Sequence, residues 1–349
     1  MALIVAGPSG SDGHDGGAGH PEQPGRIQAV MEGVDDLHLG DDLEHVEPTP
    51  APMADLLRVH TQGYLDELEE ICRRGGGDLD PDTYARPDSF ELARRAAGAG
   101  LSAVSTLESR GEGIAFVPVR PPGHHALADR PMGFCLLNNV AIAAAALTAR
   151  GQRVLVVDWD VHHGNGTQDL FWNDPNVLFV STHQWPLYPG TGKANEVGGS
   201  EALGLTVNLP LPPGATGDVV REALERVAGP AVQAFDPEWV LVSCGFDAHR
   251  DDPLGGLALS SGDFARLASL VGTFAPRPGR LALFLEGGYS ATALRASTAA
   301  TLGALLGATV DEEPPSRDGP GAEAIQMAET ARARALREGE VNQDHPANG

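Results

Sequence analysis

The feature that most constrains the fold of this chain is a series of short, predominantly apolar segments. Each segment is rich in Val, Ile and Leu and is bounded by Gly, Pro or Asp. A strand with one face in water alternates polar and apolar residues, so continuous apolar segments indicate strands buried on both faces of a parallel sheet. The segments span residues 3–6, 114–119, 154–157, 177–180, 205–209, 240–244 and 281–285.

Stretches with helical periodicity lie between these segments. Asp88-Ser-Phe-Glu91 resembles a capping box at the start of a long helix that runs to about residue 108. Alternating strands and helices favour one α/β domain over residues 1–309, with three α/β/α layers and a central, mostly parallel sheet. Further helices are predicted at 138–150, 218–235, 263–274 and 291–306.

The chain changes character near residue 310, where it becomes polar and rich in Pro and Gly. A helix is predicted at 322–337, followed by a polar end. Because this composition offers little apolar surface to bury, residues 310–349 are expected to form a peripheral or disordered tail.

The formal net charge of −24 restricts the partners of this protein. Such a surface repels phosphate backbones, so direct binding of nucleic acid is not expected. Cationic partners such as Lys-rich tails or polyamines would be attracted, although the charge fits a merely solvated acidic surface at least as well. The sequence is compatible with an oligomer.

The sequence points to a cytoplasmic protein with reduced thiols. No apolar stretch approaches the ~20 residues that span a bilayer, and the first apolar residues lack a basic flank. The cysteines, Cys72, Cys135 and Cys244, are far apart and form no CxxC pair, so neither a disulfide framework nor a cysteine metal site is expected.

Residues with catalytic or metal-binding side chains follow four of the apolar segments directly. The carboxyl ends of parallel strands meet at one edge of a sheet, where α/β proteins bind their ligands. Four segments that deliver His, Asp or Tyr to this edge therefore predict one active site. The residues are His124 and His125 after the second segment, Asp158, Asp160, His162 and Asn165 after the third, Asp247 after the sixth, and Tyr289 after the last.

Asp158, Asp160 and His162 alternate along the chain, so an extended backbone would project all three side chains to one side. Two carboxylates and an imidazole in an apolar setting repel one another unless a cation joins them. Such oxygen and nitrogen ligands suit a catalytic zinc, and Asp247 is the best candidate for a third ligand. A pair of carboxylates that merely caps turns is the alternative.

His124-His125 and Tyr289 supply the remaining chemistry. Imidazoles near neutral pKa can move protons to and from a water activated by a metal, and a phenol can donate to an oxyanion. Solvated loop histidines and a structural Gly-Gly-aromatic turn are the alternatives. His14 and His20 could line the rim, whereas His38, His45, His60 and His345 are interpreted as surface residues.

Six motifs of this chain resemble the zinc-dependent histone deacetylase family, which includes the acetylpolyamine amidohydrolases. The resemblance covers about residues 19–306 and implies an arginase-like α/β/α fold. Asn165 and the segment His20–Arg26 are more similar to the class II and bacterial branch. The motifs are Arg120-Pro-Pro-Gly-His-His125, Gly133-Phe-Cys135, Asp158-x-Asp-x-His-His-Gly-Asn-Gly-Thr167, Tyr188-Pro-Gly-Thr-Gly192, Gly245-Phe-Asp247 and Gly287-Gly-Tyr289.

The resemblance implies a catalytic role for each matching residue. Asp160, His162 and Asp247 would hold zinc, with Fe²⁺ or Co²⁺ as possible substitutes. His125 would transfer the proton of the attacking water, and His124 would act as its electrostatic neighbour. The remaining members are Asp158, which would pair with His124, Asn165, which would pair with His125, and Tyr289, which would bind the substrate carbonyl.

The resemblance also implies a substrate tunnel and a second metal. Gly133, Phe134 and Tyr188 would wall a narrow tunnel for an acyl-lysine stem, with Gly287 inside it and Leu254 at its mouth. Tyr188 replaces the Phe usual in the family, which would make the tunnel slightly more polar. A structural potassium ion is expected near Asp158, Asp160, His162, Ser181 and Thr182.

These observations predict a zinc-dependent deacetylase that converts acetyl-lysine to acetate and a free amine. A small-molecule deacylase acting on acetylated polyamines shares every catalytic residue and is the nearest alternative. A ureohydrolase of the same fold would need more bridging carboxylates for two manganese ions. A non-catalytic acetyl-lysine binder would have no use for Tyr289 and three metal ligands.

Overall fold

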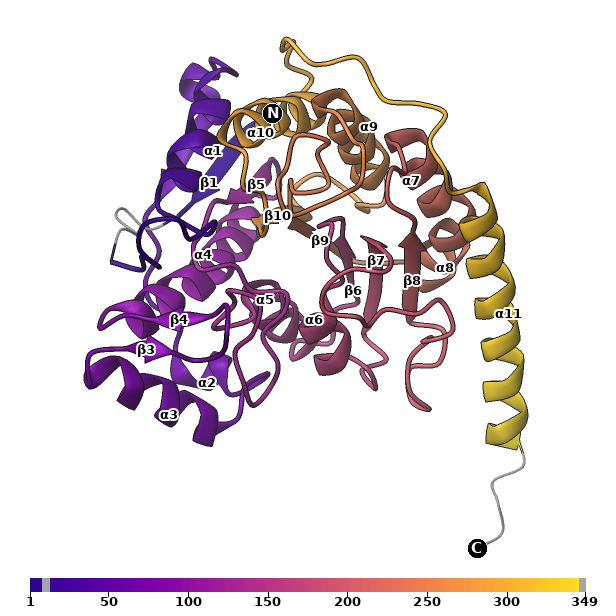
Figure 1. Cartoon of the computed structure of the whole chain (residues 1–349), viewed down its shortest axis with the longest axis horizontal. Coiled ribbons are helices and arrows are strands. Elements are labelled where there is room, and N and C mark those ends of the chain that lie inside the picture. Colours follow the sequence, from indigo (N-terminus) through magenta and orange to yellow (C-terminus); the bar gives the residue numbers. More distant parts are fainter. Residues whose placement is uncertain (8–12, 345–349) are drawn as a thin grey trace, which may run out of the picture.

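In this computed structural model, residues 1–7 and 13–344 are described. They form three layers, in which one large sheet lies between two layers of helices (Figure 1). Every strand pairing in that sheet is parallel, so the predicted fold class is confirmed. The strands are β1 (Leu3–Ala6), β2 (Leu43–Val46), β5 (Ile114–Val117), β6 (Val154–Asp158), β7 (Val177–Gln184), β8 (Thr206–Leu211), β9 (Trp239–Cys244) and β10 (Leu281–Leu285). Their order is β2-β1-β5-β10-β9-β6-β7-β8.

The two faces of the sheet pack against different helices. Along β6, Val154 and Val156 belong to one apolar core, and Leu155 and Val157 belong to the other. Continuous apolar strands thus fill both cores, as the sequence predicts. The first core includes α2 (Met53–Leu56), α3 (Gln62–Arg73), α4 (Ser89–Arg110) and α5 (Asn139–Thr148), and the second includes α1 (Gly25–Asp35), α7 (Gly217–Ala223), α8 (Gly229–Phe235), α9 (Ser261–Gly272) and α10 (Ala291–Leu306).

Edge strand β2 and helices α1 and α3 are absent from the elements predicted above. The β2 residues are only partly buried, and Glu44 and His45 interrupt their apolar character, so no continuous apolar segment marks this strand. A small antiparallel pair, β3 (Gly77–Asp78) and β4 (Tyr84–Ala85), lies in the segment that also carries Asp82.

Two helix predictions are corrected by the structure. No side chain caps α4 at Asp88, and the capping box of the chain lies instead at Ser260 and Asp263, where α9 begins. The single helix expected over 218–235 is divided by a π-helical turn, Leu224–Ala228, before α8. Pro230 at the start of α8 has no N–H to donate, which accounts for the interruption.

The segment after residue 310 is docked at the periphery of the domain. The helix predicted at 322–337 is present, whereas the alternative of a disordered tail is wrong for the described residues. Helix α11 (Ala322–Asp344) runs along the edge of the molecule beside β8 (Figure 1). Its Ile325 and Ala328 are buried, and Arg332 donates to the carbonyls of Gly204 and Thr206. The helix therefore covers an otherwise open sheet edge. Residues 345–349, with His345, lie outside the described residues.

Replacing Ile325 with Ala is expected to weaken the docking of α11 by about 2–5 kcal/mol, because a fully buried side chain is truncated. The measurement is hydrogen exchange of the α11 amides. Met327→Ala is the matched control, since Met327 is 64% exposed on the same helix and should leave exchange unchanged. Equal protection in both variants would contradict the observed packing.

Three further expectations can be compared with the structure. The three cysteines are unpaired and buried, as expected. In the described part of the chain, no helix is long and apolar enough to cross a membrane. His60, interpreted as a surface residue, is instead buried beneath the loop that carries His125, where its Nδ1 lies 2.9 Å from the carbonyl of Leu127. Burial lowers the pKa of His60 to about 4.

Candidate metal-dependent active site

The four apolar segments that are followed by catalytic or metal-binding residues form four neighbouring strands of the sheet, β5, β10, β9 and β6. Because these strands are parallel, their carboxyl ends meet at one edge of the sheet. A pocket of about 240 Å³ opens there. Its lining contains every residue that the sequence predicted for the substrate tunnel. The lining residues are Asp82, Pro122, His124, His125, Gly133, Phe134, His162, Leu187, Tyr188, Leu254, Gly287 and Tyr289.

Asp160, His162 and Asp247 form a compact ligand set, in which His162 lines this pocket. One ligand atom from each lies within 4.8 Å of the others. His162 Nδ1 is 3.1 Å from Asp160 Oδ1 and 3.2 Å from Asp247 Oδ2. Both carboxylates are fully buried. Backbone N–H groups hold their orientation, with Val161 donating to Asp247 Oδ1 at 2.8 Å and Gly287 donating to Asp160 Oδ2 at 2.8 Å.

The charges of this cluster fit a divalent cation. Burial lowers the pKa of His162, but its hydrogen bonds to Asp160 and Asp247 outweigh this effect and raise the pKa to about 10. Burial together with repulsion from Asp160 raises the pKa of Asp247 to about 7. Both shifts favour the protonated form of the group, because the buried carboxylates lack a compensating positive charge. A divalent cation would supply that charge. The nitrogen and oxygen donors, without thiolate, suit zinc and other first-row metals.

His124 and His125 are each oriented through Nδ1 by a different partner. His124 Nδ1 lies 2.9 Å from Asp158 Oδ2, and His125 Nδ1 lies 2.7 Å from Asn165 Oδ1. A carboxylate or an amide oxygen accepts a hydrogen bond from Nδ1–H. The two contacts therefore leave Nε2 of each ring as the atom available for chemistry.

The two histidines differ in charge because their surroundings differ. Burial opposes the protonation of His124, but the charges of Asp158 and Asp160 hold its pKa well above the usual value. Burial, reinforced by the charges of His124 and His162, holds the pKa of His125 well below the usual value. At neutral pH, His125 is thus a neutral base next to a cationic His124, whose ring centroid is 4.0 Å away.

We expect Asn165→Asp to shift the acidic limb of the kcat/KM profile upward by about 1–3 pH units, since a carboxylate would stabilise the protonated form of His125. The base is active when neutral, so activity is lost as the pH falls through the His125 pKa, and a higher pKa moves that loss to higher pH. Asn165→Ala, which adds no charge, should not produce this upward shift. An unmoved limb in Asn165→Asp would argue against His125 as the base.

Tyr289 reaches the pocket from a turn made by two glycines. A Cβ on Gly287 would lie 2.0 Å from Asp247 Oδ2, so only glycine lets the backbone pass this close to the ligands. Gly288 has φ +122°, a conformation that side chains disfavour. The guanidinium carbon of Arg26 lies over the Tyr289 ring, 5.0 Å from the ring centroid. The Phe134 ring meets the Tyr289 ring edge-on.

The walls of the pocket are formed by the predicted tunnel residues. Phe134 has φ +68°, a left-handed conformation that is uncommon for a residue with a side chain, and its N–H donates to Thr83 Oγ1 at 3.0 Å. Tyr188 lies opposite, edge-on to His125 at 5.3 Å, and is 38% exposed. Leu254 is half-buried at the rim.

Several residues of the site were not predicted. Glu286 is fully buried and accepts hydrogen bonds from the N–H groups of Gly123 and His124, so it fixes the loop of the histidine pair. Its position directly after β10 was the available signal. Asp82 and Leu187 line the pocket from loops, where no periodic pattern marks them.

The residues expected to offer backbone carbonyls and a hydroxyl to potassium lie on β7, at the end of β6 and just after it. Asp158 pairs with Ser181 across the ladder from β6 to β7, and Ser181 Oγ lies 3.0 Å from His183 Nδ1. Thr182 is buried, but successive strand residues face opposite sides, so its side chain points away from that of Ser181. The potassium site stays a prediction.

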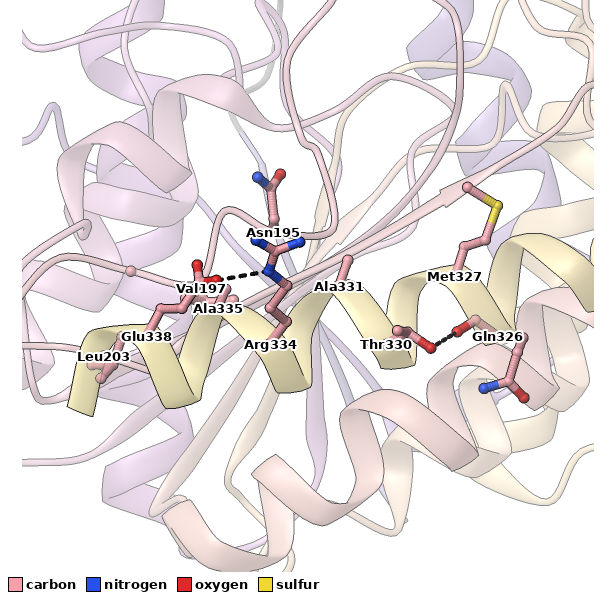
Figure 2. Close-up of a pocket in the computed structure, with 11 residues that line it drawn as sticks. Asn195, Val197, Leu203, Gln326, Met327, Thr330, Ala331, Arg334, Ala335 and Glu338 are labelled. Carbon is pink, nitrogen blue, oxygen red and sulfur yellow. Dashed lines mark hydrogen bonds and ion pairs between the residues drawn. The ribbon is translucent and has the colours of Figure 1, made fainter. Parts of the chain in front are cut away.

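A larger cavity lies elsewhere and lacks this chemistry. It measures about 870 Å³ and separates α11 from the loop that carries Asn195 and Leu203 (Figure 2). Among the described residues that line it, none is a histidine or a cysteine. The one carboxylate among them, Glu338, pairs with Arg334 at 2.7 Å.

Buried carboxylate and imidazole ligands at the end of a narrow pocket, beside a neutral base and a phenol, define a class of hydrolases that cleave amides at a metal site. The comparisons with known proteins agree. The histone deacetylase domain matches residues 20–305, so the chain belongs to the histone deacetylase family and is a hydrolytic deacetylase. The resemblance predicted over residues 19–306 is confirmed.

Individual relatives are similar over most of the chain. The histone deacetylase-like amidohydrolase of Pseudomonas aeruginosa is 39% identical over 278 residues, which cover 78% of this chain and 73% of that protein. A probable deacetylase of Archaeoglobus fulgidus is 39% identical, with 79% and 78% covered. The crystal structure of the HDA15 HD domain is 32% identical, has a TM-score of 0.87 and covers 99% of this chain and 98% of its own.

Proposed function

We propose that this chain is a zinc-dependent deacetylase that hydrolyses the amide of N-acetyl-lysine to acetate and a free amine. The convergence of Asp160, His162 and Asp247, with His162 in the lining of a pocket of about 240 Å³, carries the proposal. The pocket is small and walled by Phe134 and Tyr188, which suits a linear stem with a small acyl group. The test is to incubate the zinc-loaded protein with an acetyl-lysine peptide and to measure the acetate that is released.

The chemistry divides between the metal and the side chains. Asp160, His162 and Asp247 would hold the zinc, and the bound ion would supply Lewis acidity for the amide carbonyl and for water. His125 is neutral and turns Nε2 toward the pocket, so it accepts the proton of the attacking water. The cationic His124, held by Asp158, stabilises negative charge that develops beside it.

Tyr289 binds the carbonyl oxygen as its negative charge grows. Burial holds the pKa of Tyr289 well above its usual value, even though Arg26 opposes that shift, so the phenol remains a donor at neutral pH. A donor already fixed in place stabilises an oxyanion without reorganisation during the reaction. His125 then transfers the proton that it took from water to the leaving nitrogen. This completes the hydrolysis and restores His125 as a base.

Leu254 favours a peptide over a polyamine. Its apolar side chain can contact a peptide backbone, whereas the distal ammonium of a polyamine would need a counter-charge, for which Asp82 is the carboxylate in the same lining. The net charge of −24 would attract polyamines from solution. Steering of that kind is screened over ~8 Å at physiological salt, while a rim contact is not.

We therefore expect a higher kcat/KM for acetyl-lysine peptides than for acetylated polyamines, and Leu254→Glu should narrow or reverse this preference. Leu254→Gln is the matched control, because it removes the apolar contact without adding charge. A preference for acetylpolyamines in the unmodified protein would favour the alternative function, a small-molecule amidohydrolase with the same catalytic residues. Fe²⁺ or Co²⁺ in place of zinc and a cytoplasmic location stay predictions.

A further inference from the structure

The loop that follows the ligand Asp247 contains a buried carboxylate with no part in the chemistry described above. Asp252 is 6% exposed, whereas the side chain of its neighbour Asp251 is 68% exposed. A buried carboxylate is costly unless donors satisfy its oxygens. The two oxygens of Asp252 have one backbone donor each, and the donors belong to different segments of the active site.

One carboxylate oxygen of Asp252 accepts a hydrogen bond from the backbone of Tyr289, and the other accepts one from the backbone of Leu254. Asp252 Oδ2 accepts from the N–H of Tyr289 at 2.6 Å, and Asp252 Oδ1 accepts from the N–H of Leu254 at 3.0 Å. Tyr289 and Leu254 both line the pocket. A single carboxylate thus fixes the position of the phenol relative to the rim.

The turn before Tyr289 needs such a support because it contains two glycines. Gly287 is bonded to Asp160 through its N–H, and Arg26 donates to the carbonyl of Gly288. The N–H of Phe246 also donates to the carbonyl of Gly287 at 3.0 Å. These contacts hold the two glycines, which have the most flexible backbone of any residue, but none of them reaches the backbone of Tyr289. Arg26 and Phe134 restrict the plane of the Tyr289 ring, but neither contact is directional enough to fix the hydroxyl.

The loop that carries Asp252 is itself anchored. His249 is buried and its Nε2 lies 2.8 Å from Glu313 Oε2, which belongs to the segment after residue 310. The N–H of Asp252 donates to the carbonyl of His249 at 2.9 Å. Asp252 therefore connects a fixed loop to the backbone of Tyr289, at the end of the glycine turn.

We propose that Asp252 is a positioning residue for the reaction, which aims the Tyr289 hydroxyl at the substrate carbonyl and keeps Leu254 in register with it. The inference rests on the proposed function, because it assigns Asp252 an effect through the oxyanion donor. A hydrogen-bond donor contributes to catalysis only when it points at the developing charge, so an error of about 1 Å in its position is costly.

The test is a double-mutant cycle that combines Asp252→Asn with Tyr289→Phe. Asn is isosteric but has one acceptor oxygen, so one backbone N–H would face an amide NH₂ instead of a carboxylate. We expect Asp252→Asn alone to lower kcat by about 10–100-fold, the range typical of residues that orient catalytic ligands. In the Tyr289→Phe background there is no hydroxyl to aim, so the same change should lower kcat by less than about 3-fold, close to additivity error in such cycles.

Two controls separate positioning from stability. Asp251→Asn changes the exposed neighbour and should leave kcat, KM and the melting temperature unchanged. Asp252→Asn should retain the bound metal and a cooperative thermal transition, and any rise in KM, through Leu254, should appear in both backgrounds.

Three outcomes would overturn the proposal. They are an equal loss of kcat in both backgrounds, a kcat of Asp252→Asn close to that of the unmodified protein, and loss of fold or metal in Asp252→Asn, which would assign the carboxylate to structure. The proposed function is tested separately in the same experiment. If Tyr289→Phe alone is fully active, the oxyanion role fails, whereas an impaired Tyr289→Phe with additive losses removes only the role of Asp252.

Discussion

Asp247→Asn is expected to yield a folded protein that binds no stoichiometric divalent cation and has lost its deacetylase activity. Asp247 Oδ1 accepts from Val161, and an Asn oxygen can preserve that bond while its NH₂ replaces the ligand oxygen Oδ2. The loss of Lewis acidity removes several kcal/mol of transition-state stabilisation. At about 1.4 kcal/mol per tenfold, this corresponds to a fall in turnover of about 10³-fold or more.

Elemental analysis and activity are both needed to interpret this variant. The unmodified protein should contain about one zinc per chain, lose activity on chelation and regain it with zinc. Asp160→Ala should also lose the metal, but it leaves the buried N–H of Gly287 without its acceptor, which costs about 1–3 kcal/mol in stability. Active protein without any transition metal would refute the metal-dependent mechanism.

The parts of the fold that were predictable are those that local sequence determines. A continuous apolar segment followed by a chemically active residue marks both a buried strand and its functional end, so the side chains after β5, β6, β9 and β10 could be expected at one edge of the sheet. That these four strands are direct neighbours was not predicted. The ligand set could be predicted from the same pattern. Asp160 and His162 alternate in the chain, and Asp247 ends a neighbouring strand.

The parts that were missed depend on contacts between distant segments. Asp252 and Glu286 act through backbone N–H groups of Tyr289 and His124, and neither the spacing nor the type of these residues identifies such partners. The docking of α11 was hidden by composition. Of its residues 322–338, whose burial is described, only Ile325 and Ala328 are buried, and they lie three residues apart in a polar segment. A hydrophobic face this narrow does not predict that a helix packs against the domain. The packing becomes understandable only once β8 is known to be an edge strand with an open side.

Tyr289→Phe should lower kcat by about 10²–10³-fold with little change in metal content, in the melting temperature or in KM. The phenol contributes to the developing oxyanion more than to the neutral carbonyl of the bound substrate, so its loss falls on the transition state. The substitution keeps the ring, and with it the contacts to Arg26 and Phe134. It also keeps the backbone N–H that donates to Asp252.

The competing interpretation, in which Tyr289 only packs the wall of the pocket, makes a different prediction. Removal of a packing hydroxyl would change stability or KM and leave kcat nearly intact. Under both interpretations the acidic limb of the pH profile reports His125 and should stay in place, so kcat is the measurement that separates them. A variant with normal turnover would exclude Tyr289 as the oxyanion donor, whereas a loss confined to kcat, with zinc retained, would assign the hydroxyl to the transition state.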